Sequence, residues 1–115
     1  MAKFAIDYFE LPAAEAAPSR DFFRKAFGWG HENYGPDYVE VREAGLLGGI
    51  NADGADRSTA PLVGIRTDDI EAAAQAVVAA GGKITREVYQ FPGGRRLFFR
   101  EPGGNEMMIY SDDKA

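Results

Sequence analysis

Two stretches of the sequence place apolar residues three and four positions apart, which is the spacing of one buried face of a helix. The clearer stretch follows Thr67, and its stripe consists of Ile70, Ala73, Ala74, Val77 and Val78. Asp68 or Asp69 can cap the free N–H groups at its start, and Gly81-Gly82 can supply the left-handed residue that ends it. The pattern therefore predicts a helix from Asp69 to Ala80.

The other helical stretch runs from Glu15 to Phe27. Pro18 falls in its first turn, where the missing N–H has no hydrogen-bond partner to lose, and Gly28 can end the helix. The expected buried stripe consists of Phe22, Phe23, Ala26 and Phe27, and the expected solvent side of Arg20, Arg24 and Lys25. The stripe predicts that this helix packs through its aromatic side chains.

Short alternating or apolar runs follow each helix and predict strands. In the first half these runs cover residues 29–34, 37–42 and 46–51, and in the second half residues 83–91, 95–100 and 106–110. A further strand opens each half, over residues 4–11 and 62–66. Gly and Pro residues separate the runs, as turns require. Each half therefore reads β-α-β-β-β, and the chain is predicted to have an α+β fold.

The two halves repeat this order at a constant offset, at which Glu15 aligns with Asp69, and Gly28 with Gly82, 54 positions further on. We interpret residues 1–52 and 61–115 as two modules and the Gly-, Asp- and Ser-rich residues 53–60 as their linker. A chain of 115 residues fits one domain. The modules are therefore expected to pack as a single domain over residues 1–115.

Composition and charge exclude several classes of function. With 13 Lys and Arg against 18 Asp and Glu, the net charge is −5, which disfavours nucleic acids and anionic membranes as partners. The sequence has no cysteine, so disulfides, thiolate catalysis and cysteine-ligated metal sites are excluded. No apolar run approaches the ~20 residues of a membrane span, and Met1-Ala2-Lys3-Phe4 does not begin like a signal peptide. We expect a cytoplasmic protein.

Several short motifs occur in the order and spacing of a known family. They are Phe9-Glu10-Leu11-Pro12, Ser19-Arg20-Asp21-Phe22-Phe23, Phe27-Gly28-Trp29, Thr67-Asp68-Asp69-Ile70, Gly81-Gly82-Lys83 and Phe99-Arg100-Glu101-Pro102-Gly103-Gly104-Asn105. On these motifs the chain resembles the vicinal oxygen chelate superfamily, which includes glyoxalase I, extradiol dioxygenases and bleomycin-resistance proteins. The resemblance implies two βαβββ modules whose curved mixed sheets form a cup, with the helices outside.

The resemblance also implies where a metal site would lie. The family's metal enzymes carry His or Gln on the opening strand of each module and Glu on the last strand of each. Carried over by spacing, these positions fall at Tyr8, at Leu62 and at Met108, while residues 46–51 contain no acid or histidine. Because Leu and a Met thioether suit Zn²⁺, Fe²⁺ or Ni²⁺ poorly at such a site, we expect no metal and no cofactor. In this respect the chain resembles the family's metal-free antibiotic-binding branch.

Strand alternation predicts which side chains line the cup. If Glu101 pairs with Asn105 around a three-residue loop, Arg100 faces Glu106, Phe98 faces Met108 and Arg96 faces Tyr110. The predicted ligand-binding residues are Tyr8, Glu10, Leu62, Arg66, Phe98, Met108 and Tyr110. Two alternatives stay open: the aromatic and Met side chains simply fill the space between the sheets, and Arg100 and Glu106 form a cross-strand ion pair.

Other candidate residues have a structural interpretation as well as a functional one. His31, the only histidine, could serve as an acid–base group but is predicted to lie at the surface. Glu10 is the candidate catalytic residue, because burial would raise the pKa of its carboxyl. Gly48-Gly49 could allow a ligand close to the backbone or form a bulge. Gly93-Gly94 followed by two arginines lacks the Lys and Ser/Thr of a phosphate loop.

Three functions remain after these arguments. The first hypothesis is a metal-free protein that binds an amphipathic or aromatic small molecule in the cup. The alternative is a glyoxalase I-like lyase or isomerase that holds a metal through Glu10, Glu40 or Glu106, and a third is a scaffold for protein contacts. Both faces of the last strand, residues 107–110, are apolar, so we expect a homodimer. Whether the protein catalyses a reaction, which ligand it takes, and whether the modules swap between subunits stay open.

Overall fold

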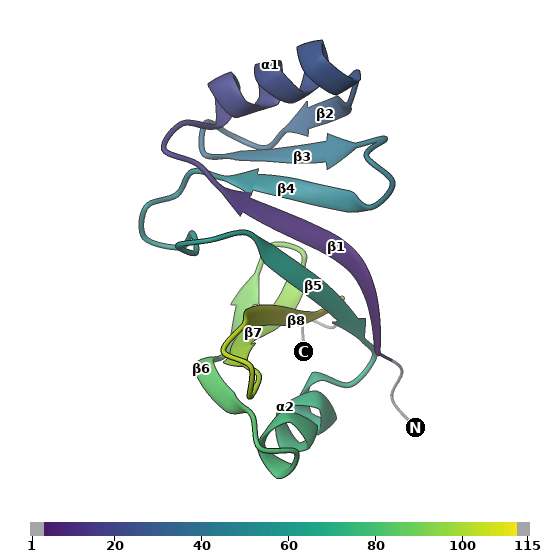
Figure 1. Ribbon diagram of the computed structural model, residues 1–115, viewed down its shortest axis with the longest axis vertical. Helices are drawn as coiled ribbons and strands as arrows, with labels where there is room; N and C mark the ends of the chain where they lie inside the picture. The colour runs from purple at the N-terminus through teal and green to yellow at the C-terminus, as the bar shows by residue number, and fades with distance from the viewer. Residues whose placement is uncertain (1–3, 113–115) are drawn as a thin grey trace. The chain divides into compact units, whose positions relative to one another are not determined.

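The computed structural model describes residues 4–112 and divides into two compact units (Figure 1). The N-terminal unit is formed by residues 8–62. The C-terminal unit is formed by residues 63–112 together with residues 4–7, at the start of the chain.

The N-terminal unit contains one helix and four strands. Its elements are β1 (Phe4–Pro12), α1 (Ala16–Phe27), β2 (Gly30–Asn33), β3 (Tyr38–Arg42) and β4 (Leu47–Asn51). The strands lie in the order β2-β3-β4-β1, with β2, β3 and β4 antiparallel and β1 parallel to β4 (Figure 1). The parallel pair is joined through α1, as a crossover connection requires.

The C-terminal unit repeats this plan. Its elements are β5 (Leu62–Thr67), α2 (Ile70–Ala79), β6 (Lys83–Phe91), β7 (Gly94–Arg100) and β8 (Glu106–Ser111). The strands lie in the order β6-β7-β8-β5, with β5 parallel to β8 and the other pairs antiparallel. The predicted α+β fold of two βαβββ modules is therefore confirmed.

In each unit the helix packs on one face of the sheet and forms the hydrophobic core there. The core of the N-terminal unit consists of Ala16, Val39, Val41 and Ile50, with Phe9, Phe23 and Trp29 packed against it. The core of the C-terminal unit consists of Ile70, Ala73, Leu97, Phe99 and Ile109. Because strand residues alternate between faces, their neighbours along each strand point away from the helix.

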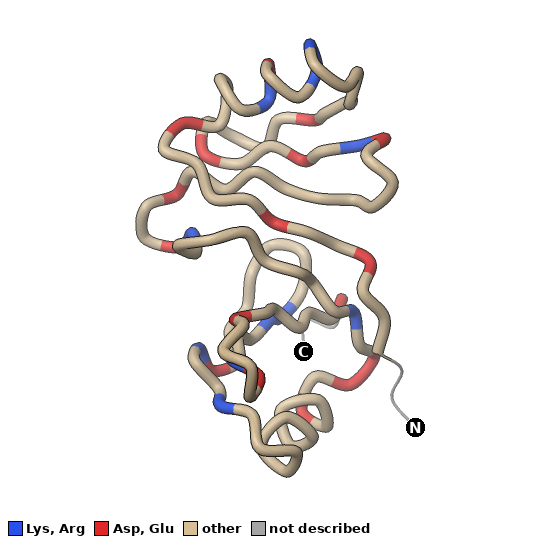
Figure 2. Tube along the Cα trace, viewed as in Figure 1, with Lys and Arg blue, Asp and Glu red and all other residues tan. Residues whose placement is uncertain are grey.

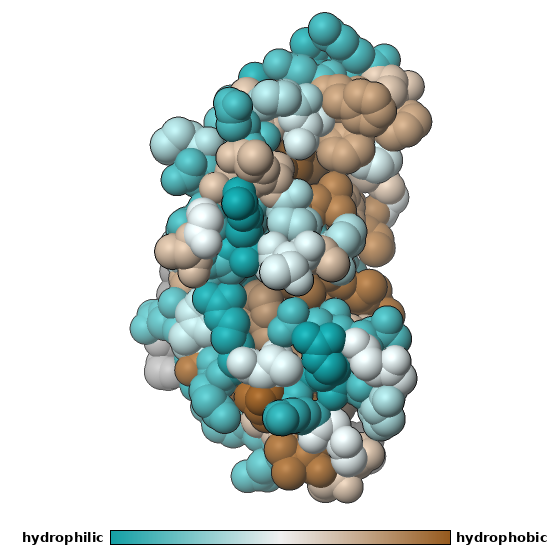
Figure 3. Space-filling view, turned by 60° about the vertical axis from the view of Figure 1, so that its left-hand side comes forward, coloured by the Kyte–Doolittle hydropathy of each residue, from teal (hydrophilic) through white to brown (hydrophobic). Residues whose placement is uncertain are grey.

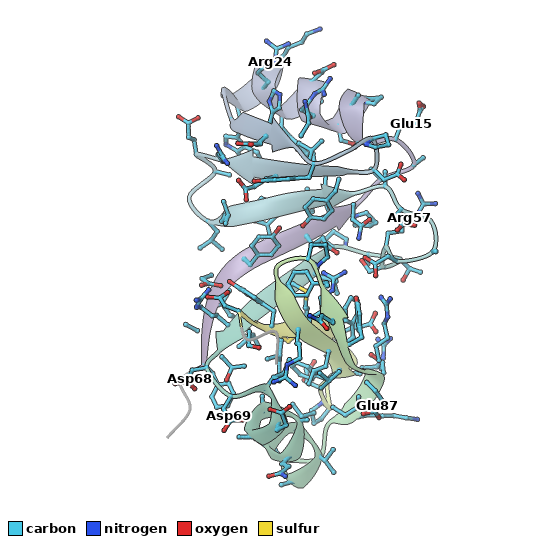
Figure 4. All side chains as sticks on the ribbon, turned by 180° about the vertical axis from the view of Figure 1, so that it is seen from behind. Glu15, Arg24, Arg57, Asp68, Asp69 and Glu87 are labelled. Atoms are coloured by element: carbon cyan, nitrogen blue, oxygen red, sulfur yellow. The ribbon has the colours of Figure 1, made fainter. Side chains whose placement is uncertain are left out.

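The helix ends follow the capping rules. The Asp69 side chain, at the first turn of α2, accepts a hydrogen bond from the Ala72 N–H at 3.0 Å (Figure 4). Gly28 after α1 and Gly81 after α2 have left-handed backbone conformations, with φ of 76° and 96°. The predicted caps at Asp69, Gly28 and Gly81 are confirmed.

The predicted buried stripe of α1 is wrong in most of its members. Phe22 and Phe27 are 58% and 59% exposed, Ala26 is exposed, and Phe23 is half-buried. The face toward the sheet runs through Ala16 and Phe23, seven residues apart, so Phe22 and Phe27 lie beside it. Their rings contact one another edge to face at the surface, and hydrophobic side chains reach the surface around α1 (Figure 3). Val78 of α2 is also exposed, contrary to the prediction.

The hairpin between β7 and β8 has the predicted register. Arg100 pairs with Glu106, Phe98 with Met108 and Arg96 with Tyr110. The Glu101 N–H donates to the Asn105 carbonyl at 3.0 Å, and Gly104 has a φ of 95° in the loop. Arg100 and Glu106 are paired in the backbone register, but their side chains have other partners. Arg100 donates to the Gly104 carbonyl, and Glu106 accepts from the Thr85 hydroxyl.

Basic residues and Asp21 lie along α1, and Arg24 lies on the side of the helix away from the strands (Figures 2 and 4). Arg24 and Lys25 occupy the last turn, where cations interact favourably with the partial negative charge of a helix end. Among residues 4–112, neither helix is long and apolar enough to cross a membrane.

Candidate ligand-binding faces

The sheet of the N-terminal unit carries a polar cluster on the face away from α1. We call Tyr8, Glu10, Tyr38, Asn51 and Asp56 the phenol–carboxylate cluster. Its members come from β1, β3, β4 and the following loop. Glu10 is 1% exposed and Asn51 is 2% exposed, so these polar groups depend on one another for hydrogen bonds.

Hydrogen bonds join the cluster into one chain. The hydroxyl oxygens of Tyr8 and Tyr38 lie 2.5 Å apart, and the Tyr38 hydroxyl donates to Glu10 Oε1 at 3.0 Å. The other carboxylate oxygen of Glu10 accepts from Asn51 Nδ2 at 3.3 Å. Asn51 Nδ2 also donates to Asp56 Oδ2 at 2.9 Å, so one amide group holds two carboxyl groups. Burial, with the nearby charge of Glu10 next, raises the pKa of Tyr38 far above its usual range.

The two glycines of β4 make room for side chains that cross the strand. A Cβ atom on Gly49 would lie 1.9 Å from the Tyr38 hydroxyl oxygen and 2.7 Å from that of Tyr8. On the helix side, a Cβ atom on Gly48 would lie 2.2 Å from the Phe9 ring. The β4 pairing with β1 and β3 continues through both glycines without a register shift, so a bulge, one of the two alternatives considered for these glycines, is wrong. Packing of aromatic side chains explains these glycines.

The sheet of the C-terminal unit carries a different cluster on the face away from α2. We call Arg86, Tyr89, Phe91, Arg96 and Phe98 the guanidinium–aromatic cluster. The Arg86 guanidinium lies 4.7 Å from the ring centroids of Tyr89 and Phe98. The Arg96 guanidinium lies 5.2–5.4 Å from the centroids of Tyr89, Phe91 and Phe98. These distances are typical of cation–π contacts.

Arg96 is the most buried charge of this cluster, at 5% exposed. Its Nε donates to the Tyr89 hydroxyl at 2.6 Å, and its Nη1 lies 3.3 Å from the Met108 sulfur. A guanidinium has five N–H donors in one plane and stays charged at every ordinary pH. Arg96 therefore places a permanent positive charge and planar donors among aromatic rings.

Tyr110 and Arg66 pair across β5 and β8 and lie on the same face of this sheet. The Tyr110 hydroxyl donates to Asp7 Oδ1 at 2.6 Å, and the Arg66 guanidinium lies 5.8 Å from the Tyr110 ring centroid. Arg66 also pairs with Asp112, and both side chains are largely exposed. Such an exposed pair contributes little stability.

The ionisation of Tyr110 gives a prediction for alkaline pH. Burial, followed by the hydrogen bond to Asp7, raises the pKa of Tyr110 to about 12 from a usual value of 10.0. The folded protein therefore binds this proton more tightly than the unfolded chain, and the resulting stabilisation is present below pH 10 and lost as the pH rises toward 12. In an absorbance titration of tyrosine ionisation, Tyr110→Phe should remove a component with a midpoint near pH 12. Loss of a component near pH 10 would contradict the assignment.

An apolar cavity of about 280 Å³ lies on the other side of the C-terminal sheet, next to α2. Its lining includes Phe4, Ala73, Val77, Phe99 and Ile109, and Glu101 is the one charged residue among its lining residues. Ligand sites usually combine apolar walls with several placed polar groups that orient the ligand. The phenol–carboxylate and guanidinium–aromatic clusters, on the sheet faces away from the helices, have several polar groups, whereas this cavity has few.

The predicted ligand-binding residues do not lie in one cluster. Tyr8 and Glu10 belong to the phenol–carboxylate cluster, and Phe98 belongs to the guanidinium–aromatic cluster with Met108 beside it. Arg66 and Tyr110 contact one another, and Leu62 is a buried apolar residue at the start of β5.

Sequence reasoning missed several members of the clusters. Tyr38, Asn51 and Asp56 were not predicted, and neither were Arg86 and Tyr89. One signal was available in the glycine pair 48–49, which marks a place where side chains come close to the backbone. The remaining members depend on which strands are neighbours and in which register, and the local pattern does not contain that information.

The residues suggested as displaced metal ligands have other partners. Glu40 accepts from Arg42 at 2.6 Å, Glu106 accepts from Thr85, and Glu10 accepts from Tyr38 and Asn51. His31 lies on β2 opposite Val41 and is half-buried. Across residues 4–112, no three His, Cys, Asp or Glu side chains come together in a group suited to a metal ion.

Comparison with protein-family models shows the family of the chain. A family model described as the Glyoxalase/Bleomycin resistance protein/Dioxygenase superfamily matches residues 5–109, which is nearly the whole chain. The chain belongs to this superfamily. The predicted resemblance to the vicinal oxygen chelate superfamily is thereby confirmed. No curated protein matches the sequence.

Solved structures of the superfamily fold resemble the chain at low sequence identity. A protein described as an NAD-dependent benzaldehyde dehydrogenase from Legionella pneumophila matches with a TM-score of 0.76 at 12% identity, over 90% of this chain and 96% of that one. The Mn(II)-bound glyoxalase from Novosphingobium aromaticivorans matches with a TM-score of 0.69 at 17% identity, over 97% of this chain and 40% of that one. Methylmalonyl-CoA epimerase from Mycobacterium tuberculosis matches with a TM-score of 0.65 at 12% identity, over 92% and 86%. At these identities the likeness shows the fold alone.

The positions that correspond to the superfamily's metal ligands do not fit a divalent metal. Tyr8 has its hydroxyl in a 2.5 Å hydrogen bond with Tyr38, and Leu62 has no donor atom. The sulfur of Met108 lies against the Arg96 guanidinium, whose charge repels a cation. The fourth strand, β4, contains no acid or histidine. The function proposed for this chain therefore does not use a metal.

Proposed function

We propose that this superfamily member binds a planar aromatic small molecule without a metal, on the face formed by the guanidinium–aromatic cluster. The single observation that carries the proposal is the stack of two guanidinium groups and the rings of Tyr89, Phe91 and Phe98 within 5.4 Å. Planar cations and aromatic faces together bind flat π-systems. Met108, against the same guanidinium, adds a polarizable contact suited to such a ligand.

The charge of the cluster favours an acidic group on the ligand. Arg86 and Arg96 bring two positive charges to the same rings. A cationic ligand would be repelled, whereas a carboxylate or phenolate can accept hydrogen bonds from a guanidinium in a planar, two-point arrangement. The ligand class is therefore an aromatic compound with an anionic group.

The similar solved structures do not select the function, because they are described as a dehydrogenase, a glyoxalase and an epimerase. Different reactions on one fold are usual, so the function must be argued from the site. The proposal depends on the cluster in this chain and on the unsuitable metal-ligand positions.

Binding of 2-naphthoate by the full chain, measured by isothermal titration calorimetry, tests the proposal. We expect binding that excess EDTA leaves unchanged, and a preference for 2-naphthoate over neutral 2-naphthalenemethanol. Arg86→Met keeps a long side chain but removes the charge, and it should weaken binding of 2-naphthoate about tenfold. Arg24→Met, on the exposed side of α1, is the matched control and should bind like the parent protein.

Three results would contradict the proposal. The first is no binding of 2-naphthoate at millimolar concentration. The second is loss of binding in EDTA, which would favour the metal-dependent lyase or isomerase. The third is an equal effect of Arg86→Met and Arg24→Met, which would place the ligand away from the cluster.

A further inference from the structure

The apolar cavity beside α2, which we call the α2 cavity, lies entirely within the C-terminal unit. Its lining comes from α2, from β5, β7 and β8, from the loops that adjoin them, and from residues 4–7, which belong to the same unit. Its floor is formed by Ala73, Phe99 and Ile109, which are at most 8% exposed. Ala76, at its mouth, is exposed. A small molecule can therefore enter while the core beneath it stays closed.

Small side chains on the helix leave this space open. Ala73, Ala76 and Ala80 all line the cavity, and their spacings of three and four residues place them on one face of α2 and its C-terminal end. One methyl group at each position does not reach across to the sheet as a larger side chain does. The space of about 280 Å³ exceeds the ~30 Å³ of one water molecule several-fold. It is therefore large enough for a ligand.

The walls favour a ligand without hydrogen-bonding groups. The side chains of Val77, Phe99 and Ile109 have no hydrogen-bond donor or acceptor, so a polar group placed against them loses its water without a replacement. Water in such a space has few partners, and an apolar molecule that displaces it gains free energy. An engineered apolar cavity of about 150 Å³ binds benzene, so the α2 cavity has room for one aromatic ring with a short substituent.

Glu101 adds a negative charge to this lining. Its Oε1 accepts from the Gly103 N–H at 2.7 Å, and its Oε2 accepts from the Asn105 N–H at 3.1 Å and from Asn105 Nδ2 at 2.5 Å. These hydrogen bonds, that of Gly103 first, lower the pKa of Glu101, so the carboxylate is ionised at neutral pH. It is the one charged group among the described residues of the lining, and it disfavours an anionic ligand.

We propose that the α2 cavity is a binding site for a small, neutral, apolar molecule, such as a monocyclic aromatic hydrocarbon. The site is distinct from the guanidinium–aromatic cluster, which lies on the opposite face of the same sheet. The inference does not rest on the proposed function, because the two faces take ligands of different character. The cluster attracts an aromatic anion, whereas the cavity accepts an uncharged hydrocarbon and disfavours an anion.

Titration of toluene into the full chain, followed by isothermal calorimetry, tests the site. We expect a dissociation constant in the millimolar range or tighter, because one ring gains only hydrophobic contacts in the cavity. The same titration in the presence of excess 2-naphthoate should give a toluene affinity within about twofold of the first, since the anion does not enter the cavity. Arg86→Met, on the other face of the sheet, should bind toluene like the parent protein.

Ala76→Leu and Ala79→Leu form a matched pair of variants. Both positions are exposed on α2, but of the two only Ala76 lines the cavity. Leucine at position 76 occupies part of the cavity and should weaken toluene binding at least about tenfold. Ala79→Leu makes the same change outside the cavity and should bind toluene like the parent protein. Both variants should fold, because leucine is nearly as good a helix former as alanine.

The outcomes separate the cavity from the cluster. The inference is overturned if toluene at millimolar concentration does not bind the parent protein, and the space is then only a gap in the packing. It is also overturned if both leucine variants weaken binding equally, or if 2-naphthoate displaces toluene, since both probes then share one site. Toluene binding that Ala76→Leu abolishes supports the cavity even if 2-naphthoate binds nowhere, in which case the proposed function alone fails.

Discussion

Replacing Gly49 with alanine should lower the free energy of unfolding by about 2–3 kcal/mol. The new Cβ would lie 1.9 Å from the Tyr38 hydroxyl oxygen, so Tyr38 has to move. Tyr38 is held between Tyr8 and Glu10, and its movement removes a hydrogen bond from the buried Glu10 carboxyl. Chemical denaturation followed by circular dichroism measures the change.

Gly54→Ala is the control for this prediction. A Cβ atom on Gly54 has no atom within 4 Å, and its backbone is not in the left-handed region. Gly54→Ala should therefore be neutral or stabilising, by up to about 1 kcal/mol. In a Tyr38→Leu background, which removes the hydroxyl and the ring, the Gly49→Ala penalty should shrink by at least about 1 kcal/mol. Equal penalties in both backgrounds would show that the clash with Tyr38 is not the cause.

The fold could be predicted because its signals are local. Asp69 before an apolar stripe, Gly28 and Gly81 after helices, and the Glu101–Asn105 hairpin each fix a helix end or a register through neighbours a few residues away. The buried face of α1 could not be predicted in this way. Its aromatic side chains suggested one stripe, but the direction of the sheet relative to the helix selected the line through Ala16.

The candidate site could be predicted only in part. Alternation along β1 places Tyr8 and Glu10 on one face, and in the structure both form hydrogen bonds with Tyr38. The partners of these residues come from strands 28 to 41 residues away in sequence. Their identity follows from the β3-β4-β1 order and its register, which is a property of the folded sheet.

The two modules place different chemistry at equivalent positions. Equivalence follows from the registers: Tyr38 pairs with Asn51 in one unit, as Arg96 pairs with Tyr110 in the other. A half-buried phenol of one module thus corresponds to a buried guanidinium of the other. The sheet face away from the helix is therefore rich in carboxyl groups and phenols in one unit and rich in guanidinium groups in the other.

Phe98→Ala should be the most destabilising of the substitutions considered, by about 3–5 kcal/mol. Phe98 is 2% exposed, and its ring contacts both guanidinium groups of the guanidinium–aromatic cluster. Truncation leaves a cavity and removes the aromatic face from Arg86 and Arg96. Phe22→Ala is the matched control: Phe22 is 58% exposed, and the same change there should cost less than about 1 kcal/mol.

Phe98→Leu separates packing from ligand binding. Leucine restores most of the apolar volume, so the free energy of unfolding should fall by less than about 2 kcal/mol. It does not restore the aromatic face on which the guanidinium groups of Arg86 and Arg96 stack, and these groups are the contacts proposed for the ligand. The variant should therefore stay folded and bind 2-naphthoate several-fold more weakly than the parent protein. If Phe98→Leu binds 2-naphthoate as tightly as the parent protein does, the ring serves packing alone, and the ligand contacts other parts of the face.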